Sequence, residues 1–172
     1  MIRFIIFFIG VISILFLAVN ETKTWDFGPP CNGDYQEKYI EVTINGCVFV
    51  VKVCAICPIG PSGTNISLLI MGFGKKVPDC SLDPSLTTEE LLGKITEKVR
   101  DNALVICQNI NFPPCDEEEY LYIYVSTPLC WVKAWYINDP PGDTVLMFWP
   151  CDLLPVTCDR GYKVCWGQNG PE

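Results

Sequence analysis

The stretch that decides the fold runs YIEVTI-NG-CVFVVKVC, from Tyr39 through Asn45-Gly46 to Cys54. Two apolar segments with period-2 alternation, joined by Asn-Gly, are typical of a β-hairpin with a two-residue turn. The register that this turn imposes puts six apolar side chains on one face, in the pairs Ile44 with Cys47, Val42 with Phe49 and Ile40 with Val51. The turn and the alternation therefore predict the same buried face, and they predict a mixed surface for the opposite face.

The rest of the chain completes an α+β outline. Thr87 and Glu90 have the spacing of a helix-capping box, and apolar residues follow at helical spacing to about Asn102. Period-2 or apolar runs predict strands at 66–73, 104–107, 120–126, 130–137, 144–149 and 162–166. The sequence thus predicts a mainly antiparallel β-sheet with one amphipathic helix packed on it.

The N-terminal residues have the layout of an export signal. Arg3 precedes an apolar run from Phe4 to Val19, which is typical of a secretory signal and slightly shorter than the roughly 17–25 residues of a membrane-spanning helix. We therefore expect residues 1–22 to be a signal peptide, or else an uncleaved N-terminal anchor. Residues 23–172 then form a single disulfide-stabilised domain of ordinary size.

The 11 cysteines all follow this apolar run. In an exported chain they indicate a disulfide framework, and with it a secreted or cell-surface location, periplasmic or extracellular. Loop length favours the pairs Cys107 with Cys115 and Cys151 with Cys158, although sequence does not fix connectivity. Because 11 is odd, we expect either a disulfide-linked homodimer or one buried free cysteine.

The formal charge of −8 excludes two classes of partner. Nucleic acid and anionic lipid both attract basic surfaces, so neither is expected to bind, and no membrane binding is expected beyond the N-terminal segment.

Catalytic patterns are missing from the sequence. There is no histidine to act as a general base, and no cofactor or metal is predicted. Cys54 and Cys57 have the spacing of a redox motif, but they follow a strand, and Pro58 makes a helix start there unfavourable. The two could pair with each other or reach separate partners. A carboxylate-dependent hydrolase and a thiol-disulfide oxidoreductase remain the alternatives to a non-enzymatic binding or structural protein.

An aromatic surface is the strongest functional candidate. Tyr120, Tyr122 and Tyr124 alternate with apolar residues and so share one face of a strand, and Trp131 and Trp135 share one face of the next strand. Aromatic rings on a rigid sheet suit contact with a glycan or another protein. The alternative is that the tyrosines are half-buried beneath the helix or a loop.

The segment Tyr39–Pro58, with Cys47 and the Cys54-Ala-Ile-Cys57 string, resembles one class of cysteine-rich exported bacterial proteins of unknown function. The later strings PLCW, ending at Trp131, and KVCW, ending at Trp166, fit the same class. The resemblance implies a bacterial cell-surface or extracellular setting, and it implies no activity.

Overall fold

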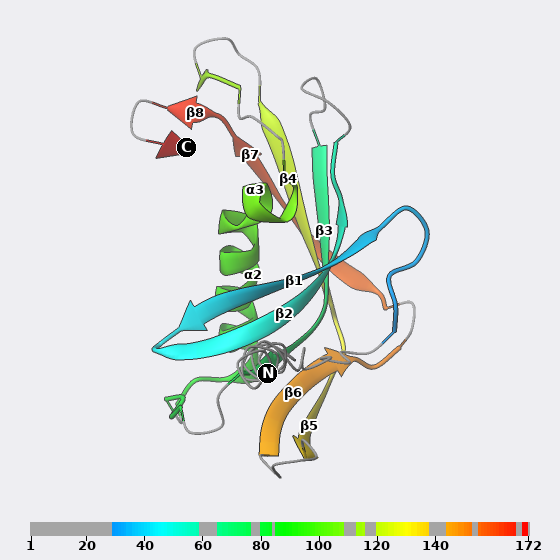
Figure 1. Ribbon diagram of the computed structural model, residues 1–172, viewed down its shortest axis with the longest axis vertical. Coiled ribbons are helices and arrows are strands. Elements are labelled where there is room, and N and C mark those ends of the chain that lie inside the picture. The colour runs from blue at the N-terminus through cyan, green and yellow to red at the C-terminus, as the bar shows by residue number, and fades with distance from the viewer. Residues whose placement is uncertain are drawn as a thin grey trace, which may run out of the picture.

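The computed structural model describes residues 29–58, 65–76, 80–83, 85–108, 113–115, 120–137, 144–152, 155–167 and 170–171. In chain order its elements are β1 (Gln36–Ile44), β2 (Cys47–Ile56), β3 (Asn65–Lys75), α2 (Thr88–Asp101), α3 (Ala103–Ile106), β4 (Leu121–Pro128), β5 (Trp131–Ile137), β6 (Thr144–Pro150), β7 (Thr157–Val164), β8 (Trp166–Gly167) and β9 (Gly170–Pro171). The predicted fold class is confirmed: a mostly antiparallel sheet carries α2 on one face (Figure 1). The predicted signal peptide lies outside the described residues.

The predicted hairpin has the predicted register. Ile44 lies opposite Cys47, and the pairing runs without interruption to Gln36 opposite Ala55. Asn45 and Gly46 both have positive φ, at 51° and 81°, which a two-residue hairpin turn requires at both positions. Phe49 is fully buried, as the register demands.

Strand β3 is the branch point of the sheet, because its two ends pair with different strands. Five strands lie in the order β1-β2-β3-β4-β7, and β6 joins the far end of β3 at Phe73 and Gly74 while pairing with β5 (Figure 1). Strands β3 and β4 are parallel, because the chain crosses between them through α2 and α3. The register between β2 and β3 shifts so that Met71 has no partner, and this bulge lets both Ile70 and Phe73 face the core.

Helix α2 begins and ends where the sequence predicts. Thr87 and Glu90 form both hydrogen bonds of the capping box, and Asn102 is the C-cap. The segment 104–107 was predicted as a strand, and this prediction is wrong. The chain turns into the short helix α3, because a further helical turn buries Ala103 and Ile106 against the same core as α2.

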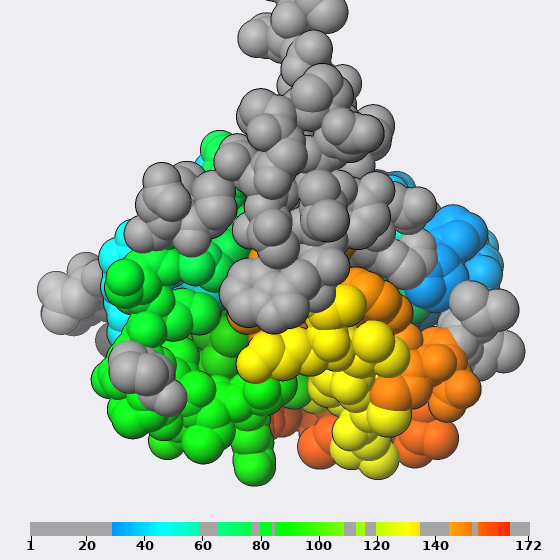
Figure 2. All heavy atoms as spheres, turned by 90° about the horizontal axis from the view of Figure 1, so that it is seen from below, coloured from blue at the N-terminus to red at the C-terminus, as the bar shows by residue number. Residues whose placement is uncertain are grey.

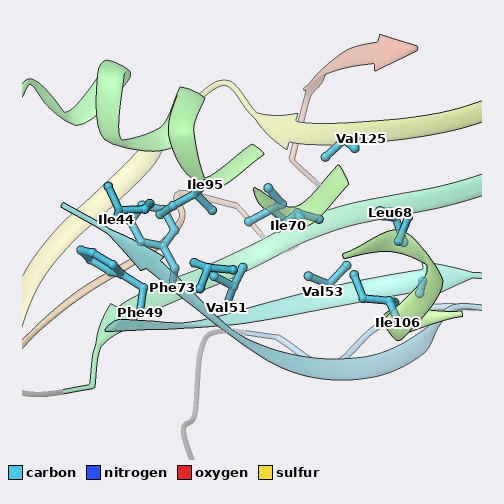
Figure 3. Close-up of a cluster of buried hydrophobic side chains, with 14 of the residues drawn as sticks. Ile44, Phe49, Val51, Val53, Leu68, Ile70, Phe73, Ile95, Ile106 and Val125 are labelled. Carbon is cyan, nitrogen blue, oxygen red and sulfur yellow. The ribbon is translucent and has the colours of Figure 1, made fainter. Parts of the chain in front are cut away.

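The main core fills the space between α2 and the sheet. Figure 3 shows Ile95 of α2 facing Ile70 of β3, with Phe73 below and Val51 beside it on β2. The Phe73 ring stacks on Phe148 of β6 at 4.6 Å between centroids. Because the core draws on β1 to β4 and β6, it fixes the sheet as a rigid platform for its other face.

The opposite face of β2 is more covered than the sequence predicts. Val50 is buried in a second small cluster with Val145 and Met147 of β6, and Lys52 is also buried. The mixed surface expected for this whole face is therefore limited to β1, where Glu41 and Thr43 are exposed. The cover over Val50 comes from the β5–β6 hairpin, and Lys52 contacts Pro29 and Glu37; hydrophobic alternation in β2 reveals neither.

Five disulfides join segments that are distant in sequence: Cys31–Cys54, Cys47–Cys80, Cys57–Cys107, Cys115–Cys165 and Cys130–Cys151. The predicted pairs Cys107–Cys115 and Cys151–Cys158 are wrong. Short loops make pairing easy in an unfolded chain, but sheet and helix packing decides which sulfurs meet. Cys158 is free and exposed, so the expectation of a buried free cysteine is also wrong.

Candidate functional site

The two faces of β4 have opposite roles. Leu121, Ile123 and Val125 are buried under the helix, whereas Tyr122 and Tyr124 point to the other face and are 38% and 40% exposed. The alternative in which the helix covers these tyrosines is therefore excluded. We call the surface around Tyr122 and Tyr124, on the side of the sheet away from α2, the tyrosine face.

Strand β7 borders the tyrosine face on one side. Tyr124 lies opposite Gly161, where an added Cβ would sit 3.2 Å from the Cε1 atom of the tyrosine ring. The glycine therefore leaves room for the ring to lie across the neighbouring strand. Lys163, opposite Tyr122, places its Nζ atom 3.4 Å from the centroid of the half-buried Tyr120 ring. The Lys163 ammonium therefore lies over the Tyr120 ring, whereas the Tyr122 and Tyr124 rings are open to solvent.

Strand β3 borders the tyrosine face on the other side with polar groups. Asn65 lies opposite Tyr122 and Ser67 lies opposite Tyr124 in the parallel pairing. Both residues alternate with buried Ile66 and Leu68, so their side chains share the face of the tyrosines. An amide and a hydroxyl therefore stand beside two exposed phenol rings on one rigid surface.

Of the two predicted tryptophans, Trp131 is not brought to this face. The Trp131 ring packs at 5.4 Å from Phe73 on the helix side of the sheet, and its Nε1 donates a 2.7 Å hydrogen bond to the Pro128 carbonyl oxygen. Trp135 belongs to β5, but its side chain lies outside the described residues. The sequence predicted the shared face of Tyr122 and Tyr124 correctly. Strand alternation alone does not show that the side chain of Trp131 faces the core.

A pocket of about 200 Å³ opens beside the tyrosine face. It is formed by the N-terminal arm, residues 30–35, against β2, β3 and the segment before β7. The lining residues are Pro30, Cys31, Asn32, Tyr35, Cys54, Leu69, Met71 and Pro155. In Figure 2 the blue start of the described chain lies beside the orange segment that includes β6. Nothing in the sequence indicated which strands the arm would cover.

Two contacts hold the arm in place. Cys31 is disulfide-bonded to Cys54 near the end of β2. The buried Lys52 ammonium donates a 3.0 Å hydrogen bond to the Pro29 carbonyl oxygen and lies 3.0 Å from a Glu37 carboxylate oxygen. Partial burial works to raise the pKa of Glu37, but hydrogen bonds from Lys52 and Tyr39 and the charge of Lys52 together lower it below its usual 4.5.

We expect Glu37→Gln to lower the free energy of unfolding by about 1–3 kcal/mol at pH 7, because it leaves the buried Lys52 ammonium without its anionic partner. Since the folded state lowers the pKa of Glu37, the carboxylate stabilises the fold above pH 4.5, and this contribution is lost as the pH falls below 4.5. The difference between wild type and variant, measured by urea unfolding, should therefore shrink between pH 7 and pH 3.

Glu41→Gln is the matched control. Glu41 pairs with Lys76, but both side chains are about half exposed, so this substitution should cost less than about 1 kcal/mol. Equal losses for the two variants at pH 7 would mean that the Lys52 pair contributes no more than a surface pair.

The redox interpretation of Cys54 and Cys57 requires a dithiol at a helix N-terminus. Cys54 instead lies inside β2, and the two sulfurs are bonded to Cys31 and Cys107 rather than to each other. Both cysteines are therefore in structural disulfides, as the position after a strand suggested, and the geometry that the oxidoreductase alternative requires is not found at Cys54. Among the described residues that line the pocket there is no carboxylate.

Within the described part of the chain, no helix has both the length and the apolar character needed to cross a membrane. No family model, curated protein or solved structure matches this chain. The resemblance to exported bacterial proteins stays a prediction, and any function has to be argued from the site itself.

Proposed function

We propose that this protein is a secreted or cell-surface binding protein without enzymatic activity, and that its tyrosine face binds a glycan. The observation that carries the proposal is the pair of exposed rings, Tyr122 and Tyr124, held at successive outward positions of one strand. Five disulfides among the described cysteines suit a domain that works in an oxidising medium.

The chemistry of the face favours a sugar. Pyranose rings have an apolar C–H face that packs on an aromatic ring, and hydroxyl groups at their edges that need hydrogen-bond partners. Tyr122 and Tyr124 supply the aromatic surface, and Asn65 and Ser67 of β3 supply donors and acceptors beside them. Lys163 supplies a positive charge beside Tyr120 on this face, although the chain's net charge is −8.

Rigidity supports the same conclusion. The back of β4 is fixed by buried Leu121, Ile123 and Val125, and β7 and β3 hold it on both sides. A ligand that binds such a preformed surface loses little affinity to ordering of the protein.

The test is a glycan array probed with the wild type and with the double variant Tyr122→Ala/Tyr124→Ala. Each aromatic contact contributes about 0.5–1.5 kcal/mol, so we expect removal of both rings to weaken binding by about fivefold to 150-fold. Because both rings are exposed, the free energy of unfolding should change by less than about 1 kcal/mol.

Tyr39→Ala is the matched control, since Tyr39 is 44% exposed but lies on β1, at the opposite edge of the sheet. It should leave glycan binding unchanged. A wild type that binds no glycan on the array, or a double variant that binds as tightly as wild type, would contradict the proposal. Selective capture of a polypeptide by the same face would indicate a protein ligand instead.

A further inference from the structure

The described residues that line the pocket beside the tyrosine face are all uncharged. Its described lining combines two prolines, Leu69, Met71 and the Cys31–Cys54 disulfide, and its hydrogen-bonding side chains are Asn32 and Tyr35. A charged group placed there would lose its hydration without gaining an opposite charge. The chemistry of the lining therefore selects a neutral, mostly apolar occupant.

The volume of the pocket limits the size of that occupant. A cavity of about 150 Å³ lined by apolar side chains is large enough to bind benzene, and this pocket measures about 200 Å³. Sites that enclose a whole drug-sized ligand are larger, at about 300–1,000 Å³. The space therefore fits one six-membered ring with a small substituent, and it does not fit an oligosaccharide.

We propose that this pocket is a binding site for an uncharged aromatic ring. The Met71 thioether suits the edge of such a ring, since sulfur–aromatic contacts are favourable. Asn32 is exposed, so its amide can hydrogen-bond a polar substituent at the open side of the pocket. The arm that carries Asn32 is fixed by the Cys31–Cys54 disulfide and by Lys52, so the wall exists before a ligand arrives.

The pocket and the tyrosine face are adjacent. Leu69, in the pocket, follows Ser67 by two residues on the same face of β3, a step of about 7 Å along the strand. Ser67 is the cross-strand neighbour of Tyr124. A glycan that carries an aryl group could therefore contact both sites at once. This last step rests on the proposed function, whereas the pocket itself does not.

The test uses benzyl alcohol as the probe and methionine methyl groups as reporters. The chain has three methionines: Met1, Met71 and Met147. Met71 lines the pocket, and Met147 is buried in the separate cluster with Val50. In spectra of the ¹³C-methyl-methionine protein, titration with benzyl alcohol should shift the Met71 signal saturably and leave Met147 in place. Benzoate, which is charged, should bind at least tenfold more weakly.

Two substitutions test whether benzyl alcohol binds in this pocket. Leu69→Trp fills the pocket and should weaken benzyl alcohol binding at least tenfold. Leu129→Trp is the matched control, because Leu129 is 65% exposed and does not line the pocket, and it should have no effect. If Leu69→Trp does not fold, Tyr35→Ala opens the wall of the pocket and should weaken binding in the same direction.

The outcomes separate this proposal from the proposed function. The variant Tyr122→Ala/Tyr124→Ala should lose glycan binding and keep the Met71 response to benzyl alcohol, and Leu69→Trp should do the reverse. Equal shifts of Met71 and Met147, no saturable shift, or equal affinity for benzoate would overturn the pocket proposal. Each of these results would leave the glycan-array result standing.

Discussion

Replacing Cys57 and Cys107 together by alanine is expected to lower the free energy of unfolding by about 4 kcal/mol. The bond joins the end of β2 to the residue after α3 and closes a loop of 50 residues. A cross-link across so long a loop removes much of the conformational freedom of the unfolded chain. The bond also holds the helical layer against the sheet, since Cys107 is buried in the core. Chemical denaturation under non-reducing conditions measures the loss.

A second double variant provides the control. Cys130 and Cys151 close a loop of 21 residues at the base of the β5–β6 hairpin, so the same model predicts a smaller loss, of about 3 kcal/mol, when both are replaced by alanine. Cys158→Ala removes no disulfide and should cost almost nothing. Losses below about 1 kcal/mol for both double variants would show that packing alone, without the cross-links, stabilises the domain.

Non-reducing electrophoresis of the protein produced in an oxidising compartment is expected to show a covalent dimer that Cys158→Ser converts fully to monomer. Cys158 is the one described cysteine outside a disulfide, and its side chain is exposed. A free thiol in an oxidising medium oxidises or exchanges until it finds a partner. Strand β7, which carries Cys158, pairs within the described residues only with β4, so a second copy can approach its other edge.

The reductant dependence completes this experiment. A reducing agent should convert the wild-type dimer to monomer, and the Cys158→Ser variant should keep its five intramolecular disulfides and its stability. Sedimentation of both forms without detergent checks the masses in the native state. A wild-type monomer whose Cys158 thiol still reacts with a thiol reagent would contradict the predicted dimer.

Much of the candidate site could be predicted from the sequence, because strand alternation is a local property. The period-2 pattern of β4 put Tyr122 and Tyr124 on one face and their apolar neighbours on the other. The pocket could not be predicted, because its walls come from an arm, two strands and Pro155, which are far apart in the chain. Trp131 illustrates the same limit. Side-chain alternation along β5 is a local property, but the direction of the β5–β6 hairpin decided that the face of β5 with Trp131 packs on the core.

By itself, the sequence determined the hairpin from Tyr39 to Cys54, the capped helix after Thr87 and the α+β class, since turn chemistry, capping and periodicity act over a few residues. Only the tertiary structure decided the disulfide partners, the parallel neighbours β3 and β4, and the pocket beneath the arm. These features depend on which distant segments meet, and that is set by burial of the whole core rather than by any local preference.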